Sequence, residues 1–133
     1  DGERFNCAEQ FYQAQKAKFH GDYVTLQQIK AASDGRAAKA AAKALRPVRT
    51  SEWNNIKADI LRDVLLKFTQ HSALREYLLQ TGDCFMVEAN PHDVYFGSGL
   101  SITDPKNADP TFCHGQNVMG LILEEIREKL RKV

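Results

Sequence analysis

Apolar residues recur at steps of three and four along most of this chain, a spacing that predicts helices rather than strands. The clearest case lies between residues 51 and 70, where one helical face collects Trp53, Ile56, Ile60, Val64 and Phe68. The same reasoning predicts further helices over 7–19, 23–32, 36–45, 72–80 and 117–132.

Short polar residues, glycine and proline mark the expected ends of these helices. Asn6 is the expected N-cap of the first helix, and Pro47 stops the alanine-rich third one. Thr50 or Ser51 can cap the long helix that follows. Gly82 suits a left-handed residue after the helix over 72–80.

The pattern changes over 85–99, where an apolar run of strand type precedes a turn and a second β-prone pair. The run covers 85–87, Asn90-Pro91 is the turn signal, and Tyr95-Phe96 restarts the strand-type sequence. We therefore expect a small β-sheet within a helix-dominated α+β fold, with residues 1–133 forming one domain. The turn-rich stretch 103–110 reads as a surface loop that could act as a lid.

The segment 85–99, which we call the corner, also contains candidate functional residues. Glu88 and Asp93 flank the turn, and Phe96 is followed by Gly97 and, after Ser98, by Gly99. Acids beside bare backbone and an aromatic ring suit a small polar ligand. A tight β-corner with solvated acids explains the same residues.

A second candidate group lies on the first helix, where Glu9 and Lys16 share a face. Seven residues separate them by roughly 10 Å along the helix axis, so a sugar-sized ligand could lie between them. Glu9 also suits a capping-box position, and Lys16 suits a surface lysine. Trp53 could line a pocket at the start of its helix or belong to the core.

The last helix begins after Gly115, Gln116 and Asn117. Small residues and unpaired N–H groups at a helix N-terminus can bind a phosphate, so these three residues are candidates for phosphate contacts. Asn117 as an ordinary N-cap is the alternative.

Composition limits the class of protein. With 133 residues, of which 43% are hydrophobic, the chain can bury the core of one domain. No apolar run approaches the roughly 20 residues that span a bilayer, so we expect a soluble monomer without membrane contact, in the cytoplasm or alternatively the nucleus. A net charge of +1 predicts no long-range attraction to nucleic acid and leaves a local basic patch open.

Neither a metal nor another cofactor is expected. The three cysteines lack the spacing of a disulfide framework or a zinc site, and the histidines are scattered. A Cys-His nucleophilic pair would need Cys84 or Cys113 near His71 or His92, and nothing in the spacing provides it.

Several short motifs, taken together, resemble the NADAR family, named for NAD and ADP-ribose metabolism. They are Cys7-Ala8-Glu9-Gln10, Lys16-Ala17, Thr81-Gly82, Val87-Glu88-Ala89, Asp93, Phe96-Gly97-Ser98-Gly99, Gly115-Gln116-Asn117 and Gly120. The family includes an N-glycosidase acting on phosphoribosylated riboflavin-biosynthesis intermediates and members that remove ADP-ribose from guanine. Phe96 replaces the tryptophan of the family's Trp-Gly-x-Gly, and Phe112-Cys113 stands near a second usual tryptophan.

The resemblance implies cleavage of the bond between ribose C1 and a nitrogen. It assigns to Lys16 a Schiff base with ring-opened ribose, to Glu9 proton transfer or ribose binding, and to Asp93 orientation or activation at the same carbon. The resemblance also implies a set of substrate contacts, with a structural role as the alternative for Trp53 and Glu88. The set is Trp53, Glu88, Phe96, Gly97, Gly99, Gly115, Gln116 and Asn117. The pocket is expected between the first helix, the corner and the start of the last helix.

The implied substrate is ADP-ribosylated guanine, free or within DNA or RNA. An N-glycosidase for phosphoribosyl aminopyrimidines is an alternative from the same family. Two others are a noncatalytic reader of ADP-ribose or a nucleotide, and a structural helical module.

Overall fold

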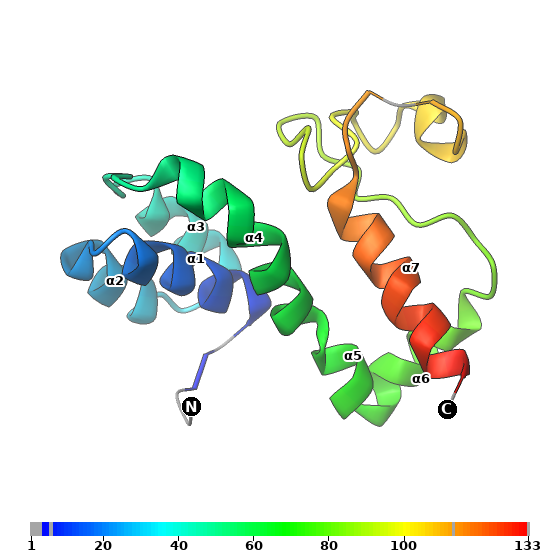
Figure 1. Cartoon of the computed structure of the whole chain (residues 1–133), viewed down its shortest axis with the longest axis horizontal. Coiled ribbons are helices and arrows are strands. Elements are labelled where there is room, and N and C mark those ends of the chain that lie inside the picture. The colour runs from blue at the N-terminus through cyan, green and yellow to red at the C-terminus, as the bar shows by residue number, and fades with distance from the viewer. Residues whose placement is uncertain (1–3, 6, 113, 133) are drawn as a thin grey trace. The chain divides into compact units, whose positions relative to one another are not determined.

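The computed structural model describes residues 4–5, 7–112 and 114–132. The chain divides into two compact units, Asp1–Val64 (unit 1) and Leu65–Val133 (unit 2). Figure 1 shows the helices in chain order. Whether residues 1–133 act as one domain stays a prediction.

Three short helices form the core of unit 1: α1 (Ala8–Phe19), α2 (Tyr23–Lys30) and α3 (Gly35–Ala42). They pack on one another through small and branched side chains, namely Ala14, Ala17, Leu26, Ile29 and Ala38. The alanines let the helix backbones approach closely. Unit 1 also holds α4 (Thr50–Leu65) up to Val64.

The side chain of Gln10 connects α1 to the end of α2 through hydrogen bonds. Its side chain is 2% exposed, and Nε2 donates to the carbonyl oxygens of Ile29, Lys30 and Ala32 at 3.1–3.2 Å. The last carbonyls of a helix have no partner within the helix. A buried amide from a neighbouring helix therefore supplies donors to carbonyls at the end of α2 and just beyond it.

Aspartates cap the two helices that follow α1. Asp22 accepts from the Thr25 N–H, and Asp34 accepts from the Ala37 N–H. The Cys7 side chain makes no capping bond at the start of α1. Asn6, the predicted cap, lies outside the described residues.

The long helix predicted over 51–70 is divided in two. α4 ends at Leu65, and α5 (Lys67–Gln70) follows as a separate turn. The Thr69 N–H and hydroxyl both donate to the Leu66 carbonyl, at 2.9 and 2.6 Å. This three-residue closure replaces the regular four-residue bond, which interrupts the helix.

Unit 2 is built on α5, α6 (Ser72–Gln80) and α7 (Val118–Arg131), with a short 3₁₀ helix, η1 (Pro105–Ala108), in the segment between α6 and α7. α7 packs against α5 and α6, and its buried apolar stripe consists of Ile122, Ile126 and Leu130. Gly82 has φ 62°, which confirms the left-handed residue predicted after α6.

The predicted β-sheet is wrong, because no strand occurs among the described residues. The run at 85–87 pairs with a side chain instead of a strand. The Asn117 amide accepts from the Glu88 N–H at 2.9 Å and donates to the Met86 carbonyl at 2.8 Å. One backbone bond, from the Ser98 N–H to the Glu88 carbonyl, adds to this contact. A single side-chain amide cannot extend a ladder, so the α+β class is replaced by a helical fold with long irregular segments.

The second β-prone pair, Tyr95-Phe96, forms backbone hydrogen bonds with the start of α7 instead of with a strand. The carbonyl oxygens of residues 94–97 accept the four N–H groups of residues 116–119, at 2.8–3.0 Å. Backbone groups that a hairpin would need are therefore committed to the start of α7.

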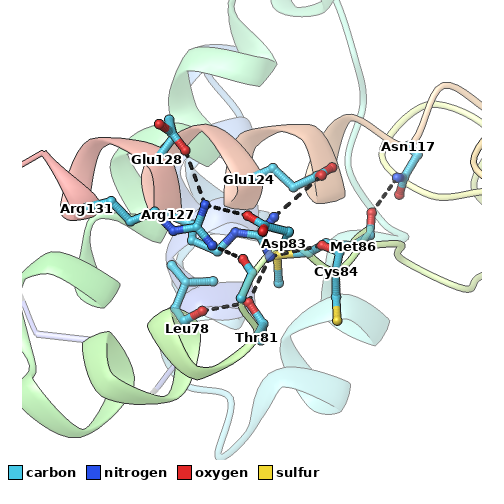
Figure 2. A network of polar contacts seen from close by, with 11 residues as sticks. Leu78, Thr81, Asp83, Cys84, Met86, Asn117, Glu124, Arg127, Glu128 and Arg131 are labelled. Carbon is cyan, nitrogen blue, oxygen red and sulfur yellow. Dashed lines mark hydrogen bonds and ion pairs between the residues drawn. The ribbon is translucent and has the colours of Figure 1, made fainter.

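Arg127, on α7, binds the turn that leads from α6 into the segment 85–99, as Figure 2 shows. The residue is 5% exposed, and its Nη1 donates to Thr81 Oγ1 at 2.8 Å and to the Cys84 carbonyl at 2.9 Å. Thr81 Oγ1 in turn donates to the Leu78 carbonyl. A buried guanidinium thus fixes the turn from which the corner begins.

We expect Arg127→Met to lower the free energy of unfolding by about 2–4 kcal/mol, because buried polar partners lose a charged donor. Urea denaturation followed by circular dichroism measures the change. Arg131→Met is the matched control, since this guanidinium binds Asp83, whose side chain is 94% exposed. The control should lose less than about 1 kcal/mol. Equal losses in both variants would contradict a special role for Arg127.

Candidate active site

Lys16 and Glu9 lie two turns apart on α1, and both are half-buried. Glu9 Oε1 accepts from Gln13 Nε2 at 3.1 Å, and the side chain packs against the backbone at Gly35. Within the described residues, Lys16 has no ion-pair partner. Its amine is therefore not committed to a structural contact, unlike the Glu9 carboxylate.

An aromatic cluster packs against the same helix. Trp53 is 2% exposed, with ring centroids 5.7 Å from Tyr12, 5.5 Å from Phe19 and 6.2 Å from His20. Buried aromatic pairs in tilted arrangements are typical of a core. Trp53 is thus a core residue in unit 1, and a substrate base could stack on it only after its neighbours move.

His20 holds the chain where α4 begins. The residue is 6% exposed, and Nδ1 accepts from the N–H groups of Val48 and Arg49, each at 3.2 Å. Burial lowers the pKa of His20 below its usual 6.5, and the positive charges of Lys16 and Arg49 lower it further. With Nδ1 accepting, the proton of the neutral ring lies on Nε2.

Acidification should destabilise unit 1 through His20. Its pKa is lower folded than unfolded, so its contribution to stability is present above the unfolded value near 6.5 and is lost as pH falls below it. We expect the melting temperature, followed by the fluorescence of Trp53, to fall between pH 7.5 and pH 5.

The matched variants are His20→Asn, whose Oδ1 can still accept, and His71→Asn at an exposed position. His20→Asn should flatten the pH dependence, and His71→Asn should keep it. An unchanged slope in His20→Asn would rule out this histidine as the cause.

In unit 2, Asp93 uses one carboxylate oxygen to shape the corner. Oδ1 accepts from the N–H groups of Tyr95 and Phe96, at 3.0 and 2.8 Å. Oδ2 makes no hydrogen bond within the described part of the chain. The half-buried carboxylate is thereby oriented by the backbone through one of its two oxygens.

Glu88 and Gly97 meet through backbone atoms. A Cβ at Gly97 would lie 2.8 Å from the Glu88 carbonyl oxygen and 2.9 Å from that of Asp93. The corner itself thus requires glycine at this position, whether or not a ligand approaches it. The Phe96 ring packs edge-on against Tyr95, with centroids 4.8 Å apart. Gly99 has φ 71°, and its Cα faces the His114 ring.

The residues before α7 have less free backbone than the sequence predicts. The N–H groups of Gln116 and Asn117 donate to the carbonyls of Val94 and Gly97, and Gly115 lies against the backbone at 97–98. Asn117 is 7% exposed with φ 51°, and its amide holds Met86 and Glu88. A phosphate here would depend on the exposed Gln116 side chain rather than on these two N–H groups.

A small pocket opens beside these residues within unit 2. Ser98, Asn107, His114, Gly115 and Asn117 are among the residues that line it. The buried Oδ1 of Asn107 has no hydrogen-bond partner among the described residues. Asn107, one of the lining residues, therefore carries a buried acceptor whose hydrogen-bonding capacity is not used by the described residues.

The sequence did not reveal the structural roles of Gln10, His20 and Arg127, whose side chains hydrogen-bond to distant backbone groups. His20 follows Lys16 by four residues, so helical spacing already places both on one face. Gln10 and Arg127 carried no such signal, because their partners lie 19 to 46 residues away.

Two absences concern the described part of the chain. No group of three or more His, Cys, Asp or Glu side chains there is placed to hold a metal ion. No helix there is both long and apolar enough to cross a bilayer.

Known proteins resemble this chain over nearly its whole length. An N-glycosidase of Acanthamoeba polyphaga mimivirus is 33% identical over 97% of this chain and 78% of its own. N-glycosidase YbiA of Escherichia coli (strain K12) is 30% identical over 98% of this chain and 73% of its own. The NMR structure of E. coli YbiA matches with a TM-score of 0.73, covering 99% of this chain and 71% of that one.

Residues 1–131 match the family model described as the NADAR domain. The relatives share at least 30% identity with the chain, which covers more than two thirds of each. This chain belongs to the NADAR family.

Proposed function

We propose that this protein is an N-glycosidase that cleaves the bond between ribose C1 and a base nitrogen, with ADP-ribosylated guanine as substrate. Relatives named N-glycosidases support the reaction class. The substrate rests on the family resemblance, and the residue roles rest on that resemblance together with the local geometry of each unit.

Lys16 carries the proposed chemistry. After the ribose ring opens, its neutral amine adds to C1 and the base nitrogen leaves with a proton, which gives a Schiff base between C1 and Nζ. Water then adds to C1, the C1–Nζ bond breaks, and the lysine amine and free ADP-ribose are regenerated. The net reaction consumes one water and releases the guanine base, which leaves as guanosine when the substrate is ADP-ribosylated guanosine.

Glu9 and Asp93 have separate tasks in this proposal. Glu9 delivers or accepts the proton at the leaving nitrogen, for which a half-buried carboxyl group on the Lys16 face of α1 is suited. For Asp93, in unit 2, the family resemblance implies orientation or activation at the reacting carbon, and Oδ2 is the carboxylate oxygen that the backbone contacts of Tyr95 and Phe96 leave for this role.

One observation carries the assignment to Lys16. Its side chain is half-buried and has no ion-pair partner among the described residues, whereas Lys18 on the same helix is exposed. A lysine nucleophile needs an amine that is sheltered and not tied to a carboxylate.

The test is incubation of the full chain with ADP-ribosylated guanosine, followed by chromatography of the released nucleoside. Release with free ADP-ribose as co-product supports the proposal. Turnover of a phosphoribosyl aminopyrimidine alone would replace the substrate and keep the reaction class. Calorimetric binding of ADP-ribose with no release from either substrate would instead indicate a noncatalytic reader.

A further inference from the structure

Basic residues are concentrated in one part of a nearly neutral chain. Residues 16–49 contain eight lysines and arginines and only two acids, Asp22 and Asp34, although the whole sequence has a net charge of +1. Both acids cap helices, where they accept backbone N–H groups. They are therefore placed to stabilise α2 and α3 rather than to pair with the exposed cations around them.

Three of these cations form one row, which we call the α3 basic stripe: Arg36, Lys39 and Lys43. Spacings of three and four residues place them on one face of α3 and its C-cap, Lys43, over roughly 10 Å. All three are exposed, and none has an ion-pair partner among the described residues. Ala38 is fully buried in the core, so the stripe is the outer face of α3.

An open pocket of about 370 Å³ lies next to the end of this stripe. Its lining residues are Asp22, Val24, Thr25, Gln28, Ala44 and Arg46. Ala44 and Arg46 follow Lys43 almost directly in the chain, which joins pocket and stripe. This volume falls within the usual range for small-molecule sites, about 300–1,000 Å³.

The pocket lining suits a nucleobase better than an acyl chain. Gln28 offers an exposed amide that can donate to and accept from a base, and Val24 provides apolar surface. The Asp22 carboxylate already accepts from Thr25 and from the Arg46 N–H. Tyr23, 61% exposed, stands beside Val24 at the start of α2. Tyr23 is not among the residues that line the pocket, and an exposed aromatic ring is a residue type on which the bases of a single strand can stack.

We propose that this surface of unit 1 binds single-stranded nucleic acid, with phosphates along the α3 basic stripe and at Arg46 and one base in the pocket. This binding is distinct from the chemistry proposed for Lys16 and does not depend on it.

Fluorescence anisotropy with an unmodified, labelled 12-nucleotide single strand tests the proposal. Three or four neutralised phosphates predict a slope of log affinity against log salt of about −2 to −3. Lys39→Glu/Lys43→Glu should weaken binding at least about tenfold at low salt and flatten the slope. The matched control, Lys129→Glu/Lys132→Glu, changes net charge equally at exposed positions of α7 and its C-cap, and should keep wild-type affinity.

A second pair of variants tests the pocket. Gln28→Ala removes a lining amide and should weaken binding about threefold with the salt slope unchanged, because the loss is not ionic. Gln27→Ala, at an exposed neighbouring position outside the pocket lining, should have no effect. Circular dichroism of all four variants verifies that the helices remain.

Three results would overturn the proposal. The first is no binding of the oligonucleotide at low salt, and the second is equal weakening in both charge-reversal variants. The third is tighter binding to phosphatidylserine vesicles than to the oligonucleotide, with the same dependence on Lys39 and Lys43, which would identify the stripe as a membrane contact.

Discussion

Replacement of Lys16 by methionine should reduce the release of guanosine from its ADP-ribosylated form by at least about a thousandfold. The variant lacks the amine that forms the covalent bond, and the remaining acids can only assist direct attack by water. Methionine keeps the length and the apolar stem of the side chain, so α1 should stay packed against α2 and α3. Initial rates at saturating substrate measure the loss.

Lys18→Met is the matched control, because this lysine is exposed on the same helix and the net charge changes equally. It should retain nearly full activity. Borohydride added during turnover should reduce the Schiff base and leave the sugar on the peptide that carries Lys16, as mass spectrometry would detect. Full activity of Lys16→Met, or trapping on another lysine, would refute the covalent role.

The local part of the fold was predictable from the sequence. Periodic apolar positions placed the main helices of both units to within a few residues, and the left-handed Gly82 followed from its position after α6. The break at Leu66 was not predictable from the period, because it depends on the hydroxyl of Thr69 closing a turn.

Non-local pairing explains the failure over 85–99. Phe85, Met86 and Val87 have strand character, yet the partner of this segment is the Asn117 amide, about 30 residues later. The carbonyls of residues 94–97 similarly find donors at 116–119. Residue propensities report the tendency to form a strand and contain no information about which partner will be present.

The candidate site residues likewise have some features that the sequence could predict and others that it could not. Helical spacing alone was enough to place Glu9 and Lys16 on one face of α1. Nothing local indicated that Asp93 commits only one oxygen to the corner, or that Gly97 is needed for a backbone contact. Motifs therefore located the residues, and the structure shows which of their atoms are already occupied.

The corner that presents Asp93 depends on how closely α7 approaches it. The position at which this approach is tightest is Gly120, where an added Cβ would lie 2.0 Å from the Met86 carbonyl oxygen and 2.5 Å from Asn117 Nδ2. Both atoms belong to the contact that holds residues 86–88. Methyl groups are not accommodated at such distances from backbone, so the segment must separate from α7.

Gly120→Ala should therefore destabilise unit 2 by more than about 3 kcal/mol. Hydrogen exchange should show lost protection over 84–99 and 114–121, while Trp53, the sole tryptophan and a residue of unit 1, keeps its fluorescence. Gly82→Ala is the matched control, because a Cβ there meets nothing within 4 Å and the change costs only the left-handed conformation, about 1–2 kcal/mol. If both alanine variants unfold at the same urea concentration, backbone conformation rather than the contact with Met86 explains the need for glycine.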